Sequence, residues 1–179
     1  VRREPYEKNL FWRMGCIEVE IVILLSGLGT CIATVYLAFF ASKQLDEQRI
    51  HHKQKSTVEL LISNNNNPFY REQRKLFVDM RRNGKSFTAL ACKINESGAH
   101  EGENATILAV LNSIEFICVG IKEDIFDEAV YKRMSRSSVI NDWDTLKPYI
   151  MELRRLNGNN KKLFCEFEWL AEKWIEEDK

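Results

Sequence analysis

The sequence predicts an all-α protein: one N-terminal transmembrane helix followed by a multi-helix bundle in the cytoplasm. Residues 21–41 form an uncharged apolar run, and the rest of the chain places its apolar residues at helical spacing. No stretch shows the alternation of a β-hairpin. The predicted division is an interfacial lead-in (1–20), the transmembrane helix (21–41), a juxtamembrane helix with an Asn-rich break (42–67) and a soluble helical domain (68–179).

The run 21–41 is long enough to cross a bilayer. At about 1.5 Å per residue it reaches about 32 Å as a helix, against a hydrocarbon core of about 30 Å. A cleaved signal peptide is the first alternative, but its apolar core is shorter, and Phe39-Phe40-Ala41-Ser42-Lys43 is a poor cleavage site. A buried core helix is the second, and about 10–14 apolar residues suffice for one. In the lead-in, Phe11 and Trp12 suit the membrane interface.

Small residues recur every four positions in the predicted span, at Ser26, Thr30, Thr34 and Ala38. This spacing places them on one helical face, where two helices can approach closely. The stripe predicts a homo-oligomer formed through the span. The alternative is a chance pattern, since small residues are common in membrane helices.

The segment after the span is rich in helix-forming residues. It either continues as one helix to about Ile62 or restarts at Ser56, because Ser56-x-x-Glu59 has capping-box spacing. The asparagines 64–67 and Pro68 predict a break, with Asn67 as the N-cap of a helix that ends at Asn83-Gly84. The expected apolar stripe of that helix is Phe69, Tyr70, Gln73, Leu76, Phe77 and Met80.

The remaining segments predict further helices and loops. Residues 87–94 fit either a short helix or an extended piece, and residues 96–104 predict a surface loop. Residues 107–121 are apolar on most faces and predict a buried helix, with Gly120 as its C-terminal glycine. Asp124 and Asp127 are candidate N-caps of the next helix, in which Phe126 packs against Tyr131.

Two helices complete the expected domain, after a polar, serine-rich stretch at 134–139 that predicts a turn. Residues 140–156 form an amphipathic helix that ends at Asn157-Gly158, and the last helix runs from about Asn160 to Glu176. The expected inward residues of these helices are Trp143, Leu146, Tyr149, Ile150, Leu153, Leu163, Phe164, Phe167, Leu170, Ala171 and Trp174. Trp169 falls off the inward stripe and is a candidate contact for a partner or for lipid headgroups.

Charge composition argues against a nucleic-acid partner, because Lys+Arg and Asp+Glu are both 26. A local basic cluster nevertheless forms at Arg71, Arg74, Lys75, Arg81 and Arg82. Beside a membrane these side chains could meet anionic lipid headgroups, so the lipid bilayer is a predicted partner. The alternative is a solvated basic face.

No motif predicts catalysis, a cofactor or a metal. The five cysteines contain no C-x-x-C pair, and His100-Glu101-x-Glu103 lacks the spacing of a helix-borne zinc motif. No phosphate-binding loop or nucleophile elbow is present. Lysines and arginines flank the span on both sides, but the scattered thiols favour a reducing compartment, so we expect the C-terminal domain in the cytoplasm.

Asn112 and Glu115 are a candidate buried polar pair, because they interrupt an apolar helix three residues apart. A buried carboxylate must be paired or protonated. One hypothesis is a polar pocket in which Glu115 acts on a ligand or a proton. The other is a structural ion pair between Glu115 and Arg154 or Arg155, with Asn112 bonded to backbone.

Several of these positions carry a family resemblance. The pattern comprises Leu111-Asn112, Glu115-Phe116-Ile117, Gly120-Ile121, Ile125, Asp127-Glu128, Arg154-Arg155, Phe164, Phe167-Glu168, Leu170-Ala171 and Trp174. It resembles the bacterial domain-of-unknown-function family 4760. The resemblance implies one span before a small helical domain in a bacterial inner membrane, and it implies no established activity.

Three functions follow as hypotheses. The first is a membrane-anchored, non-enzymatic module whose cytoplasmic domain binds an unidentified protein partner or senses a signal. The second is an effector that acts on the membrane, for example in phage defence or toxicity, through oligomerisation of its span. The third, less favoured, is an enzyme that uses Glu115.

Overall fold

The computed structural model describes residues 6–94 and 100–177, and it describes side chains from Ile23 onward. The lead-in residues 1–5 and the side chains of Phe11 and Trp12 lie outside this description. The described residues are helical without a strand, so the predicted all-α class is confirmed. The helices are α1 (Tyr6–Asn66), α2 (Pro68–Arg82), α3 (Phe87–Cys92), α4 (Glu101–Lys122), α5 (Glu128–Leu156) and α6 (Cys165–Glu176). The chain forms two compact units, residues 1–49 and 50–179.

The first unit is the N-terminal part of α1, and its apolar side chains are exposed over the part whose side chains are described, from Ile23 onward. Large hydrophobic side chains point outward all round the helix and are between 45% and 72% exposed. They are Ile23, Leu24, Leu25, Leu28, Ile32, Val35, Tyr36, Leu37, Phe39 and Phe40. By length and composition α1 and α4 could each cross a membrane, but about half of α4 is buried inside the protein.

The second unit begins within α1, before the expected boundary at Pro68. Of the two alternatives for the segment after the span, the continuous helix is observed, because α1 runs unbroken to Asn66 without a restart at Ser56. Thr57 is 1% exposed, and its hydroxyl donates to the Lys53 carbonyl within α1. The same oxygen accepts a bond from the backbone N–H of Asp127 at 2.8 Å. Leu60 and Leu61 pack on the domain core, so the last turns of α1 belong to the domain.

Helix α2 begins as predicted, since the Asn67 side chain accepts hydrogen bonds from the backbone N–H groups of Phe69 and Tyr70. It ends at Arg82, and Gly84 follows with φ +65°. The predicted stripe is only partly correct. Phe77 and Met80 are buried, whereas Phe69 is 63% and Leu76 44% exposed. The ambiguous segment 87–94 forms the short helix α3 after the cap of Ser86.

Helix α4 is the centre of the domain and contacts α2, α3 and α6. It begins at Glu101, so the expected loop over 96–104 is wrong at its C-terminal end, and residues 95–99 lie outside the description. Gly120 lies within α4 and does not form the expected C-terminal cap. Glycine is needed there for another reason, because a Cβ at this position would overlap the Phe126 ring. Asp124 (φ +59°) takes the left-handed position after α4.

Helix α5 runs from Glu128 without the predicted turn at 134–139. Serine lowers helix propensity only slightly, and this stretch contains neither glycine nor proline. Asp127 is the N-cap and accepts from the Val130 N–H. The exposed Pro148 lies inside the helix without ending it. The predicted inward residues Trp143, Leu146, Tyr149, Ile150 and Leu153 are all buried.

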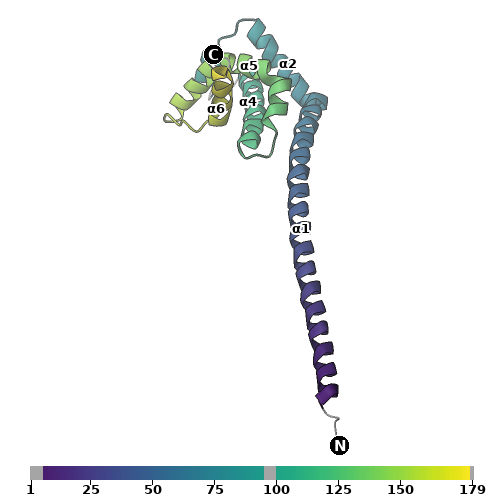
Figure 1. Cartoon of the computed structure of the whole chain (residues 1–179). Coiled ribbons are helices and arrows are strands. Elements are labelled where there is room, and N and C mark those ends of the chain that lie inside the picture. The colour runs from purple at the N-terminus through teal and green to yellow at the C-terminus, as the bar shows by residue number, and fades with distance from the viewer. Residues whose placement is uncertain (1–5, 95–99, 178–179) are drawn as a thin grey trace, which may run out of the picture. The chain divides into compact units, whose positions relative to one another are not determined.

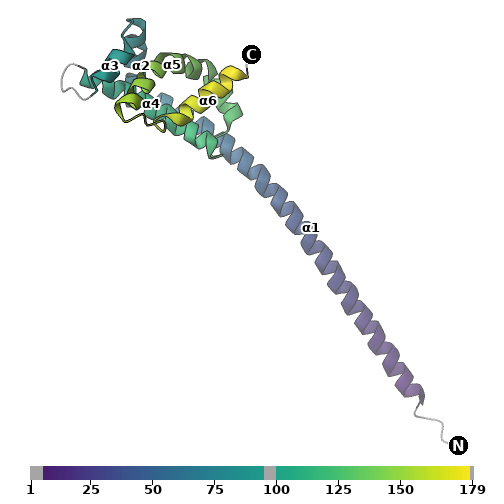
Figure 2. The ribbon, with the colours of Figure 1, turned by 90° about the vertical axis from the view of Figure 1, so that its left-hand side faces the viewer.

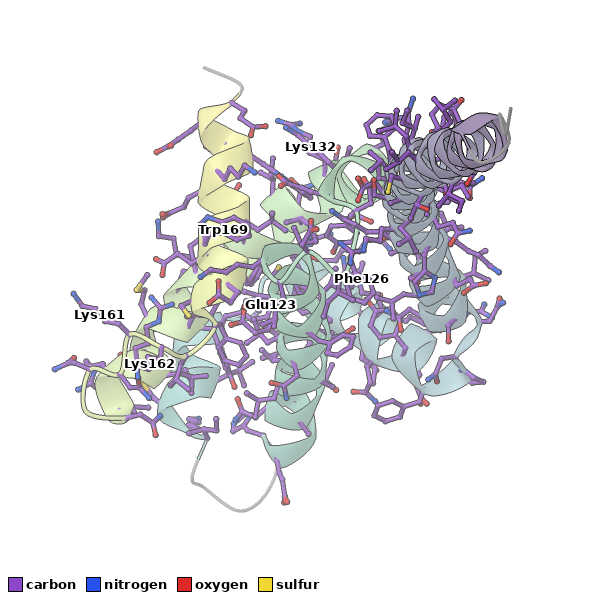
Figure 3. The ribbon with its side chains drawn as sticks, turned by 60° about the horizontal axis from the view of Figure 1, so that its bottom comes forward. Glu123, Phe126, Lys132, Lys161, Lys162 and Trp169 are labelled. Atoms are coloured by element: carbon purple, nitrogen blue, oxygen red, sulfur yellow. The ribbon has the colours of Figure 1, made fainter. Side chains whose placement is uncertain are left out.

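Helix α6 begins five residues later than predicted, because Phe164 has φ +54°. Leu163 and Phe164 are therefore half-buried, whereas Phe167, Leu170, Ala171 and Trp174 are buried as expected. Helix α6 packs on α4 and α5 (Figures 1 and 2). Figure 3 shows Trp169 on α6, where Lys122 and Lys173 lie over its ring.

Candidate functional site

A buried carboxylate between two arginines is the central polar feature of the domain. Asp142 of α5 is 2% exposed, and its Oδ2 lies 2.5 Å from Nη2 of Arg74. Nη1 of Arg81 lies 3.5 Å from Oδ1 of the same carboxylate. Both guanidinium groups also lie over the Phe77 ring. Burial raises the pKa of Asp142, and the charges of Arg74 and Arg81 oppose that shift.

This arrangement corrects part of the predicted lipid-facing basic cluster. Arg74 and Arg81 turn toward Asp142 and are only partly exposed, so they are not free to meet headgroups. Arg71, Lys75 and Arg82 are exposed, and for them lipid contact stays a prediction. The prediction was wrong for these two arginines because Arg74 and Arg81 lie on the same side of α2 as the buried Phe77.

A cavity of about 240 Å³ opens beside Arg74 and Asp142. Its walls come from the last turns of α1 and from α2, α4 and α5. Polar side chains on the wall, besides Arg74 and Asp142, are Asn64, Asn65, Tyr70, Tyr131, Ser135 and Ser138. Apolar ones are Leu61, Ile114, Ile117, Met134 and Val139.

Two groups at this cavity have unused hydrogen-bonding capacity. Nη1 of Arg74 is buried and makes no hydrogen bond within the described residues. The Tyr131 hydroxyl likewise has no hydrogen bond to the described part of the chain, although Arg74, Tyr70 and Asp142 all act on it electrostatically. Burial, aided by Cys118 and Tyr70, raises the pKa of Tyr131, so its hydroxyl stays protonated at neutral pH and can donate.

Asn112 and Glu115 do not form the predicted buried pair. Asn112 is exposed, and Glu115 is half-buried. The Glu115 carboxylate accepts hydrogen bonds from the backbone N–H groups of Phe167 (2.7 Å) and Glu166 (3.2 Å), in the first turn of α6. Burial raises the pKa of Glu115, and these two bonds oppose the shift. Glu115 therefore caps α6, which the sequence reading did not predict.

The arginines offered as partners of Glu115 bond elsewhere. Arg154 donates to the Leu163 carbonyl at 2.9 Å and to Glu168 at 2.8 Å, and it fastens the loop before α6. Arg155 pairs with Glu152 of its own helix. The expected ion pair is wrong, because the Glu115 carboxylate instead accepts from backbone N–H groups in the first turn of α6.

The predicted stripe in the span is present on the surface of α1. Ser26, Thr30 and Thr34 are exposed, but each hydroxyl donates to a backbone carbonyl of its own helix, at Ile23, Ser26 and Thr30 respectively. Ala38 is exposed as well. With their hydroxyls turned back onto the helix, these residues present a small surface, and their association stays a prediction.

Among the described residues, no group of three or more His, Cys, Asp and Glu side chains could hold a metal ion. His100 contacts Glu103 at 3.1 Å and Lys93 at 3.3 Å.

Asp142 and Asn104 are among the buried polar residues that the sequence analysis did not predict, although the sequence pattern around each contains a signal. Asp142 lies on the inward stripe of α5, between Val139 and Leu146. Asn104 is 4% exposed and bonds both the Leu90 carbonyl and the Tyr149 hydroxyl. A polar residue at an inward position of an amphipathic helix requires a partner, and that rule points to both.

The family model of a domain of unknown function, DUF4760, matches residues 23–174, which is most of the chain. The chain belongs to the DUF4760 family. The predicted resemblance is thus confirmed, and the match includes the exposed apolar part of α1, the Asp142 cluster and the Glu115 cap of α6. Neither the curated proteins nor the solved structures contain a match to this DUF4760 chain.

Proposed function

We propose that this DUF4760 protein is a membrane-anchored, non-enzymatic interaction or sensing module. Residues 21–41 of α1 cross the bilayer, and the domain from Ile50 onward binds a protein partner or a small ligand. The observation that carries the proposal is the apolar surface of α1, which is exposed on all sides from Ile23 to Phe40. Each large apolar side chain left in water costs about 1.5–3 kcal/mol relative to burial, and lipid removes that cost.

The remaining features favour a bacterial inner membrane with the domain in the cytoplasm. The described cysteines Cys31, Cys92, Cys118 and Cys165 are free thiols, as is usual in a reducing compartment. Helix α4 is similarly apolar, but about half of it is buried by its neighbours, which supports a place in the domain core and a single pass of the described chain through the membrane.

Fractionation of cells that produce the intact chain tests the anchor. We expect the wild type in the alkali-resistant membrane fraction. Arginines at Leu28 and Ile32 place charge in the centre of the span and should release the chain or abolish its accumulation. An arginine at Leu45, which is also exposed but lies after the span, is the matched control and should leave the chain in the membrane. A wild-type chain that stays in the soluble fraction contradicts the proposal.

Orientation is tested with the change Ser137→Cys, at an exposed position, in a background in which Cys16, Cys92 and Cys165 are replaced by serine. A membrane-impermeant maleimide added to intact spheroplasts should leave it unlabelled, and lysis should expose it. Labelling before lysis would place the domain outside the cytoplasm.

A second candidate is an effector that perturbs the membrane through oligomers of its span. The supporting observation is the small face at Ser26, Thr30, Thr34 and Ala38, whose hydroxyls bond to their own helix. The paired changes Thr30→Leu and Thr34→Leu should abolish cross-linked oligomers and any associated toxicity, whereas Val35→Leu should preserve both. Oligomers and toxicity that survive the paired change would exclude this candidate.

A further inference from the structure

The cavity beside Asp142 has the dimensions and the lining of a small-molecule site. Its volume of about 240 Å³ lies below the roughly 300–1,000 Å³ of pockets that hold drug-sized ligands, so its ligand has only a few non-hydrogen atoms. The wall combines two kinds of side chain. Arg74, Tyr131, Ser135 and Ser138 are among its polar residues, and Leu61, Ile114, Ile117 and Val139 are aliphatic.

The charge of the Asp142 cluster favours an anion with one negative charge. Arg74 and Asp142 on the cavity wall balance each other, and Arg81, which contacts Asp142 but does not line the cavity, gives the cluster of three a net charge of +1 when Asp142 is ionised. Asp142 is the only acidic residue on the cavity wall, within the described residues. A dianion such as phosphate would leave one charge uncompensated in a partly buried site.

The hydrogen-bonding groups favour an acceptor on the ligand. The Arg74 side chain is 26% exposed and retains donor capacity beyond its bond to Asp142. The Tyr131 hydroxyl is protonated and makes no bond to the described part of the protein. A carboxylate is planar and accepts two bonds side by side, the geometry that guanidinium groups recognise best.

We infer that this cavity binds a small organic monocarboxylate. Its carboxylate accepts hydrogen bonds from Arg74 and Tyr131, and its short hydrocarbon part packs against Ile114, Ile117 and Val139. Binding depends only on the domain. That the bound molecule is the signal read by the domain rests on the proposed sensing function.

Ligand-dependent thermal unfolding of the detergent-solubilised full chain tests the inference, because a ligand that binds the folded state alone raises the unfolding temperature. Sodium butyrate is the probe, with butyramide as its neutral counterpart, inorganic phosphate as a dianion and sodium chloride at matched ionic strength. We expect butyrate alone to give a saturable rise, with a midpoint below about 10 mM.

Two variants locate the site. Tyr131→Phe removes one hydroxyl and should raise the butyrate midpoint about tenfold, the loss typical of one hydrogen bond to a charged group. Ser138→Leu fills the cavity from an exposed position on its wall and should abolish the rise. Tyr36→Phe, the same change in the first unit, should leave the midpoint unchanged.

The inference is overturned if folded wild type shows no saturable rise with butyrate, or if butyramide or phosphate gives an equal or larger one. An unchanged midpoint in both Tyr131→Phe and Ser138→Leu overturns it too. These outcomes are separate from failure of the membrane anchor, which fractionation reports without any ligand.

Discussion

Thr57 of α1 accepts a 2.8 Å hydrogen bond from the backbone N–H of Asp127, the residue that caps α5. Thr57 is almost fully buried, and Leu60 and Leu61 pack beside it on the domain core. Lys53 also contacts Asp124, in the turn between α4 and α5. One hydroxyl thus connects the last turns of α1 to the start of α5.

Thr57→Val should lower the free energy of unfolding by about 1–2 kcal/mol. Valine keeps the shape of threonine but leaves the partly buried Asp127 N–H without its acceptor. Chemical unfolding of the detergent-solubilised chain measures the change. Thr145→Val is the matched control, because within the described residues the Thr145 hydroxyl bonds only to the Asn141 carbonyl of its own helix. Equal effects of the two substitutions would contradict a special role for Thr57.

Glu115→Ala should destabilise the domain by about 2 kcal/mol, since it removes the acceptor of two backbone N–H groups at the start of α6. Glu115→Gln should cost less, because its amide oxygen can still accept one of the bonds. Asn112→Ala, an exposed change on the same helix, should stay within about 0.5 kcal/mol of wild type. If Asn112→Ala destabilised the domain as much as Glu115→Ala, the result would support the original prediction that Asn112 and Glu115 act as a buried polar pair.

Gly120→Ala should destabilise the domain by about 1–3 kcal/mol, because the added methyl would overlap the Phe126 ring. Combining it with Phe126→Ala should cost less than the sum of the two single changes, since the clash is then removed. Gly102→Ala is the control, because nothing lies within 4 Å of the added Cβ. Strict additivity would show that Phe126 is not the obstacle.

Glu128 should make the stability of the domain depend on pH in the acid range. Burial raises its pKa, but hydrogen bonds from Lys173 (2.7 Å) and Trp174 (3.0 Å) and the charge of Lys173 outweigh burial and hold the pKa below its ordinary 4.5. A depressed folded-state pKa contributes stability that is present above pH 4.5 and is lost as the pH falls through the folded-state pKa.

Glu128→Gln should therefore lower the unfolding temperature near pH 7 and weaken its decline below pH 4.5, as followed by circular dichroism at a series of pH values. Glu123→Gln, an exposed change in the turn before α5 (Figure 3), should alter neither. An unchanged acid profile in Glu128→Gln would exclude Glu128 as a source of the dependence.

Periodicity and capping residues were enough to predict much of the domain. Asn67 before Pro68 and Asp127 before Glu128 are side-chain caps, a local effect that sequence spacing reveals. The predictions were wrong where tertiary contacts determine the local conformation. The serines at 135 and 138 suggested a turn, yet packing of Tyr131 and Val139 keeps that stretch of α5 helical.

The candidate site was less predictable, because its parts come from distant segments. The basic residues of α2 were noticed, but their partner Asp142 follows Arg74 by 68 residues along the chain (142 − 74). Helical spacing assigns a residue to a side of its own helix and says nothing of which helix packs there. The same reason explains why Glu115 was matched with Arg154 rather than with the backbone of α6.

The asparagine run at 64–67 looks like a natural place to separate a soluble domain from its anchor, but α1 continues through most of it. A chain cut at Pro68 would lose Thr57, Leu60 and Leu61, together with Asn64 and Asn65 of the cavity wall. Such a fragment should expose its core and aggregate. A water-soluble version suited to crystallisation should instead begin near Ile50, where the second compact unit starts.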